Sequence, residues 1–116
     1  EDGIRDLVRS RGLGDVYKRQ IFTAREQAYS EERATRYQHY AARFAAKEAF
    51  FKALGTGYRF GMAFHEIEVV NDALGKPIIE VQGKVKEYIE LHGIKHIHLS
   101  ISHVKAMASA FVVLEK

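Results

Sequence analysis

A glutamate within a run of aromatic and alanine residues is the strongest chemical signal in the sequence. At about 100° per residue, one stripe of a helix would contain Tyr37, Ala41, Phe44, Glu48 and Phe51. This spacing predicts that Glu48 lies in the middle of an apolar face. A carboxylate there costs several kcal/mol unless it is paired, hydrogen-bonded or bound to a cation. The stripe therefore predicts a metal ligand at Glu48, or else a structural salt bridge or a helix edge that reaches water, and these interpretations stay open.

Cations flank this glutamate on the same predicted helix. Arg43 and Lys47 are four residues apart on an adjoining side, and Lys52 lies one turn beyond Glu48. A carboxylate can hold a divalent ion, while lysine and arginine neutralise phosphate oxygens that the ion does not reach. The combination is typical of a site for a metal-chelated phosphate ester, whereas the cations alone fit a solvated helix face.

The histidines near the C-terminus give a weaker signal. His96 and His98 share one predicted strand face and His103 follows, but zinc needs a third and usually a fourth ligand, and no sequence-near residue completes such a set. His103 lies where the strand turns, either on the surface or beside the helix of Glu48. The sequence has no cysteine, and the serines of this strand lack the glycines of a nucleophile elbow, so cysteine and serine hydrolases are disfavoured.

Length and composition bound the class of protein. The 116 residues leave room for one domain, and 47% of them are hydrophobic, so a core can form. No apolar run approaches the roughly 20 residues of a membrane helix, and the sequence has no signal-peptide pattern. Together with the absence of cysteine, this predicts a soluble cytoplasmic protein without a membrane partner. The net charge of +3 does not demand a nucleic acid partner.

Helices are predicted by caps and composition. Thr23 and Glu26 match a capping box, which marks a helix start. A run rich in helix formers extends from Glu31 to Leu54, and Gly55 offers the left-handed residue that ends helices. Residues 84–93 form a short amphipathic pattern.

Strands are predicted by alternating polarity. Residues 64–70 and 78–82 predict a β-hairpin around a glycine-containing turn. Residues 96–102 alternate clearly, and residues 107–115 form a more uniformly apolar strand, which predicts that sheet and helix cover both of its sides. The order of elements predicts an α+β fold, with a long helix packed on a mostly antiparallel sheet.

Three blocks of sequence resemble one known family. They are RFAAKEAFFKALGTG, EIEVVNDALGKP and HLSISHVKAMASAFVVLE, at 43–57, 66–77 and 98–115. In order and spacing they are similar to holo-acyl-carrier-protein synthase, the short-chain group of phosphopantetheinyl transferases, over a single domain at 21–116. The resemblance implies the 4′-phosphopantetheinyl transferase fold. It also implies transfer of 4′-phosphopantetheine from coenzyme A to a serine of apo acyl carrier protein, with release of adenosine 3′,5′-bisphosphate. Magnesium on the diphosphate, a homotrimer and a role in fatty acid biosynthesis and lipid metabolism are implied as well.

The resemblance further implies roles for individual residues. Glu48 matches the family's magnesium-binding glutamate, and Lys52 and His103 match residues that contact the phosphates of coenzyme A; these three form the expected catalytic set. Glu48 or a metal-held water would accept the proton of the incoming serine. The other expected coenzyme A contacts are Arg43, Lys47, Gly55, Thr56, Gly57, Gly75, Lys76 and Pro77.

Residues 1–20 differ from the family. The family begins with a strand whose aspartate is the second protein ligand of magnesium, followed by a basic helix that docks the carrier protein. Here GIRDLV places Asp6 one residue out of step and close to Ile21. The segment is interpreted as a non-native, adapter-like start, which implies weak binding of coenzyme A and slow or absent transfer. Two alternatives stay open: a catalytically impaired fragment that binds coenzyme A, and a basic α+β module that binds RNA with the polar face of residues 96–102.

Overall fold

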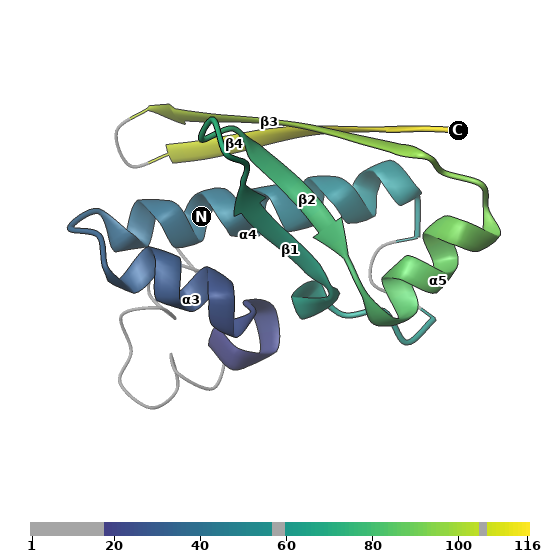
Figure 1. Ribbon diagram of the computed structural model, residues 1–116, viewed down its shortest axis with the longest axis horizontal. Helices are drawn as coiled ribbons and strands as arrows, with labels where there is room; N and C mark the ends of the chain where they lie inside the picture. Colours follow the sequence, from purple (N-terminus) through teal and green to yellow (C-terminus); the bar gives the residue numbers. More distant parts are fainter. Residues whose placement is uncertain (1–17, 57–59, 105–106) are drawn as a thin grey trace.

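The computed structural model describes residues 18–56, 60–104 and 107–116, without the side chains of residues 103 and 104. Its elements are α3 (Ala24–Glu31), α4 (Arg36–Leu54), the 3₁₀ helix η1 (Phe64–Glu66), β1 (Ile67–Asn71), β2 (Pro77–Val81), α5 (Gly83–Leu91), β3 (His96–Val104) and β4 (Met107–Glu115). Figure 1 shows α4 alongside the long β3–β4 hairpin, with β1 and β2 crossing in front of it and α3 and α5 towards opposite ends. Among these helices, none is both long and apolar enough to cross a membrane.

All strand pairs of the described residues are antiparallel. In the β1–β2 hairpin Ile67 lies opposite Val81, and in the β3–β4 hairpin His96 lies opposite Glu115. The edge of β2 lies beside β3, so the two hairpins adjoin. The prediction of an α+β fold with a long helix and antiparallel sheet is confirmed.

Two element boundaries differ from those that the sequence predicts. The long helix begins at Arg36 and not at Glu31, because α3 extends to Glu31 and the Glu32 N–H then caps it by donating to the Ser30 carbonyl. The predicted strand at 64–70 begins with η1, where the Glu66 carboxylate accepts from the Ala63 N–H at 3.0 Å. A backbone hydrogen bond therefore marks the end of α3, and a side-chain hydrogen bond accompanies the turn that precedes β1.

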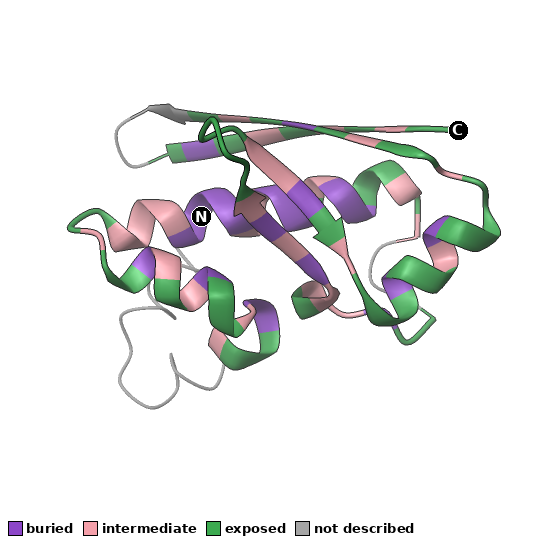
Figure 2. Ribbon diagram, in the orientation of Figure 1, coloured by how far each residue is buried: buried purple, intermediate pink, exposed green. Residues whose placement is uncertain are grey.

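The main core lies where α4 meets the strands and α5. Figure 2 shows buried residues along α4 and β1. This cluster consists of Ala46, Phe50, Phe51, Met62, Ile67, Val69, Ile79, Val85, Ile89 and Leu99. A second contact is made by small residues, where Ala41 and Ala42 pack on Ala108 of β4 and let the helix approach the strand closely. Both contacts fix α4 against the sheet.

One side of β4 is uncovered in the single chain. Along this strand buried and half-buried residues alternate with exposed ones, and the exposed set includes Met107 at 67%, Phe111 at 78% and Val113 at 55%. The prediction that β4 is covered on both sides is therefore wrong for one chain, because α4 packs on one side only.

Candidate functional site

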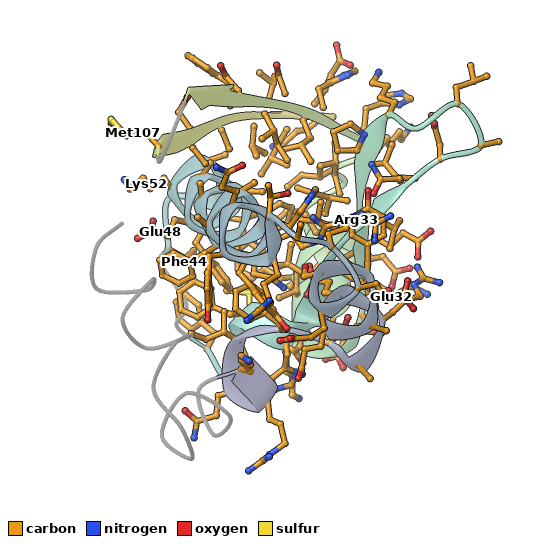
Figure 3. The ribbon with its side chains drawn as sticks, turned by 90° about the vertical axis from the view of Figure 1, so that its left-hand side faces the viewer. Glu32, Arg33, Phe44, Glu48, Lys52 and Met107 are labelled. Carbon is orange, nitrogen blue, oxygen red and sulfur yellow. The ribbon has the colours of Figure 1, made fainter. Side chains whose placement is uncertain are left out.

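Helix α4 carries the predicted site residues on two different sides. Arg43 and Lys47 point into the protein and are 5% and 0% exposed. Glu48 and Lys52 are exposed, and Figure 3 shows both extending from the same outer side of the helix, the side on which Met107 also lies. The expected single helix surface, with the Glu48 carboxylate flanked by three cations, is thus divided between two sides of α4 in one chain.

The prediction that Glu48 lies in the middle of the apolar face is wrong for the single chain. The buried stripe of α4 instead runs through Tyr40, Arg43, Lys47 and Phe50, at steps of three, four and three. Long cationic side chains can pack their aliphatic stems in a core when their head groups find partners. Because two residues of this buried stripe are cations, the polarity pattern of the sequence does not reveal it.

Lys47 is held by a buried ion pair. Its Nζ lies 2.8 Å from Glu26 Oε1, and both side chains are 0% exposed. The ammonium also donates to the carbonyl oxygens of Phe64, at 3.0 Å, and Ile67. Burial lowers the pKa of Lys47, and the charge and hydrogen bond of Glu26 oppose that shift. The structure places this lysine in the interior, and its expected contact with coenzyme A stays a prediction.

A cavity of about 440 Å³ lies between α3, α4 and the β1–β2 hairpin. Its lining residues are Arg25, Tyr29, Arg43, Val69, Val70, Asn71, Asp72, Ile78 and Glu80. Both helices and both strands therefore contribute to its walls, and polar and apolar side chains are mixed, as is common in sites for small molecules.

Arg43 brings a buried positive charge to this cavity. Its Nη2 donates to Asn71 Oδ1 at 3.3 Å, and its guanidinium carbon lies 4.4 Å from the centre of the Tyr29 ring. Its Nε is buried and has no hydrogen-bond partner within the described residues. Burial lowers the pKa of Arg43, with the Glu26 charge opposing it, but a guanidinium stays protonated in proteins.

A buried donor without a partner is rare in native proteins and calls for an explanation. The neighbouring Arg25 is already engaged, because it pairs with Glu68 at 3.0 Å and Glu80 at 2.9 Å. On the other side, the Arg33 guanidinium carbon lies 3.3 Å from the centre of the Tyr29 ring. An anionic ligand in the cavity would satisfy the Arg43 donor, because arginine binds phosphate and carboxylate oxygens through several N–H groups.

In a single chain, the backbone of His103 in β3 lies beside a part of α4 that is far from Glu48. The register pairs it with Ala108, which packs on Ala41 and Ala42 of α4. Glu48 follows Ala41 by seven residues, or about 10 Å of helix. The side chain of His103 lies outside the described residues, so its direction stays a prediction.

The expected glycine loops lie at two different places. Gly75, Lys76 and Pro77 close the β1–β2 hairpin, where Asp72 Oδ1 accepts from the N–H groups of Leu74 and Lys76 at 2.9 Å. Asn71, Asp72 and Ile78 beside this turn line the cavity of Arg43.

The other loop follows α4. Gly55 ends the helix with a left-handed φ of 81°, and Thr56 comes next. Gly57 lies outside the described residues. Neither Gly55 nor Thr56 lines the cavity of Arg43.

Three residues of the site were absent from the sequence-based prediction. Glu26 was identified as a helix cap, but nothing in its local pattern indicates that it pairs with Lys47. Tyr29 and Asn71 meet Arg43 only through the tertiary fold. The spacing of Arg43 from Tyr40 and Phe50, at three and seven residues, is the sequence signal that could have indicated its buried position.

Glu48 has the chemistry of a magnesium ligand. Within the described residues no three His, Cys, Asp or Glu side chains gather closely enough to hold a metal. Magnesium, however, commonly uses one or two carboxylates together with waters and substrate phosphates. The exposed carboxylate of Glu48 fits that demand in part. Asp6, which is one residue out of step with the family's second magnesium ligand, lies outside the described residues.

Comparisons with known proteins agree with one another. The family model for the 4′-phosphopantetheinyl transferase superfamily matches residues 6–111 and thus includes part of the segment 1–20. The chain is 46% identical over 102 residues to the holo-[acyl-carrier-protein] synthase of Solibacter usitatus, covering 88% of this chain and 82% of that one. With the enzyme of the same name from Geotalea daltonii it shares 50% identity over 96 residues, or 83% of this chain and 77% of the other.

Solved structures show the same likeness. The crystal structure of holo-[acyl-carrier-protein] synthase from Neisseria meningitidis matches with a TM-score of 0.88 and 36% identity, over 99% of this chain and 90% of that one. The synthase from Bacillus anthracis, solved in complex with coenzyme A (3′,5′-ADP), matches with a TM-score of 0.71 and 38% identity, over 94% and 88%. The inference from three blocks of sequence is therefore confirmed: this chain belongs to the holo-[acyl-carrier-protein] synthases of the 4′-phosphopantetheinyl transferase superfamily.

Proposed function

We infer that this chain transfers the 4′-phosphopantetheine group of coenzyme A to a serine of apo acyl carrier protein. Membership of the holo-[acyl-carrier-protein] synthases gives the reaction class. The structural observation that carries the proposal is Arg43, a buried residue that lines a cavity of about 440 Å³ and whose Nε has no hydrogen-bond partner among the described residues. A phosphate of coenzyme A is the anion that this donor would bind.

We propose that the nucleotide end of coenzyme A occupies this cavity. Tyr29 and the apolar side chains of Val70 and Ile78 supply surface for a base or sugar, and Arg43 supplies the charge. The turn with Gly75, which lies at the cavity, has no side-chain atom within 4 Å of a would-be Cβ and thus leaves open space there. The synthase of Bacillus anthracis was solved with coenzyme A (3′,5′-ADP), which supports a nucleotide ligand for this fold.

The reaction is proposed to occur at the outer side of α4. The serine oxygen attacks the phosphorus next to pantetheine, the bond from that phosphorus to the bridging oxygen breaks, and adenosine 3′,5′-bisphosphate leaves. Glu48, alone or through a neighbouring water, accepts the serine proton. Lys52, one turn away, neutralises the charge that develops on the departing 5′-phosphate of adenosine 3′,5′-bisphosphate. Magnesium held by Glu48 would supply electrostatic stabilisation of that diphosphate.

A homotrimer is part of this proposal. Phe111, Val113 and Met107 form an exposed apolar row on β4, which a neighbouring copy would cover. Glu48 and His103 lie about two turns of helix apart in one chain, so a site that uses both is expected to form between neighbouring chains. The proposed setting is the cytoplasm and fatty acid biosynthesis, as the resemblance implies.

Mass spectrometry of the acceptor tests the proposed function. The chain is incubated with coenzyme A, magnesium and an apo acyl carrier protein, and the same mixture with a serine-to-alanine carrier is the control. The expected result is a gain of one phosphopantetheine on the normal carrier alone. Binding of coenzyme A without any mass gain would identify an impaired fragment, and salt-dependent binding of RNA without affinity for coenzyme A would contradict the proposal.

A further inference from the structure

The ion pair of Glu26 and Lys47 has no part in the chemistry described above, yet its polar atoms are fully used. Lys47 Nζ has three donors, and they reach Glu26 and the carbonyls of Phe64 and Ile67. Glu26 Oε1 also accepts from the Thr23 N–H at 3.0 Å. A buried network in which every member is satisfied is rigid, whereas a partly satisfied one is costly.

This network joins three elements at one point. The second oxygen of Glu26, Oε2, accepts from the Val69 N–H of β1 at 2.8 Å. The pair therefore connects the start of α3, the middle of α4 and the backbone of β1. Among the described residues it is the ion pair with both side chains completely buried. Its geometry leaves α4 little freedom to rotate or slide against β1.

The same three elements form most of the cavity of Arg43. Three wall residues lie close in sequence to residues of the network: Tyr29 follows Glu26 by three residues, Arg43 precedes Lys47 by four, and Asn71 follows Val69 by two. On a helix, three or four residues correspond to one turn, and on a strand two residues return to the same face. The contacts of Arg43 with Asn71 and Tyr29 are therefore made one short step from the network.

We infer that Glu26 and Lys47 are positioning residues for the binding of coenzyme A. They hold α3, α4 and β1 at the separation at which Arg43, Tyr29 and Asn71 meet around the ligand. Neither residue lines the cavity, so they act through its walls. This inference rests on the proposed binding of coenzyme A in the cavity.

The test compares the affinity for coenzyme A of a variant without the network with that of a variant destabilised at another site. Glu26→Gln with Lys47→Met removes both charges, which avoids leaving one buried charge without its partner. Val85→Ala, in the fully buried core position of α5, is the stability control because it lowers the melting temperature without touching the cavity. Lys84→Met with Glu87→Gln neutralises an exposed pair and controls for the change in charge.

Equilibrium dissociation constants for coenzyme A and melting temperatures are measured for every variant, and KM and kcat wherever transfer occurs. The double variant is expected to bind coenzyme A about tenfold more weakly, since small displacements of binding groups have large effects, with KM raised more than kcat is lowered. Both controls are expected to bind within about twofold of the unmodified chain. If the double variant does not fold, Glu26→Asp takes its place in the test. This substitution keeps the charge but shortens the side chain, and it is also expected to weaken the binding of coenzyme A.

The outcomes separate the two proposals. If the unmodified chain fails to bind coenzyme A, the proposed function is wrong. If the unmodified chain binds coenzyme A and the network variants bind it equally well, the positioning role is wrong. The positioning role is also wrong if the network variants lose no more affinity than Val85→Ala does for a similar fall in melting temperature, because the network is then merely structural.

Discussion

Two buried cations four residues apart on α4 differ in whether all of their hydrogen-bond donors have partners. Every donor of the Lys47 ammonium has an internal acceptor, so the energetic cost of burying it is offset within the protein. Arg43 is nearly as buried but keeps a donor without a partner among the described residues. The difference indicates that Lys47 serves the fold and that Arg43 is available to a ligand.

Glu48 can be tested separately from stability because it is exposed. Glu48→Gln keeps the size of the side chain and removes the charge that we propose holds magnesium and accepts the serine proton. We expect kcat to fall at least about hundredfold, because metal ligation contributes several kcal/mol to such reactions, while the melting temperature stays unchanged. The measurement is magnesium-dependent transfer followed by mass spectrometry.

Glu87→Gln, on the exposed side of α5, is the matched control and should transfer at the normal rate. An unchanged rate for Glu48→Gln as well would show that this carboxylate has no role in the reaction.

At the scale of elements, local chemistry was predictable and tertiary pairing was not. The capping box of Thr23 and Glu26 is present as predicted, with both reciprocal hydrogen bonds, because it depends on residues three apart. The antiparallel hairpins and Gly55 at the end of α4 also follow from local patterns. The direction in which Glu48 points was predicted wrongly, since the burial of Lys47 depends on Glu26, twenty-one residues earlier.

The start of α5 depends on a glycine. Gly83 has a φ of +60°, and a Cβ there would collide with the Glu66 carboxylate, which accepts from the Lys84 N–H at 2.9 Å. Gly83→Ala is therefore expected to destabilise the protein by about 2 to 4 kcal/mol, through backbone strain and steric conflict. Urea unfolding at a fixed protein concentration measures this loss.

Gly93→Ala is the control for strain alone, because that glycine also has a positive φ of +69° but open space around it. It is expected to cost about 1 to 2 kcal/mol. Equal losses for the two variants would mean that the contact with Glu66 imposes no constraint on α5.

At the scale of the molecule, one chain leaves the outer side of β4 uncovered. The row of Met107, Phe111 and Val113 on β4 faces away from α4, and the outer residues Glu48 and Lys52 lie on a side that includes Met107 (Figure 3). Covering the row with neighbouring copies would bury apolar surface and enclose the reacting groups together. Assembly and catalysis are therefore expected to depend on the same surface.

Phe111→Lys tests that dependence. The side chain is 78% exposed in one chain, so the substitution should leave the fold of a chain intact while placing charge in the proposed interface. Light scattering after size exclusion is expected to give three times the chain mass of 13.2 kDa for the unmodified protein and the mass of a single chain for the variant, with transfer lost. A variant that stays trimeric and active would place the interface elsewhere.

Binding of adenosine 3′,5′-bisphosphate to the unmodified chain and to Arg43→Met tests the central claim most directly, namely that the cavity of Arg43 receives the anionic end of coenzyme A. Methionine preserves much of the buried stem and removes the charge. Calorimetry is predicted to show binding by the unmodified chain and at least about tenfold weaker binding by the variant, since hydrogen bonds to charged groups contribute about 1.5 to 3 kcal/mol. Equal affinity in a variant that remains folded would contradict the account.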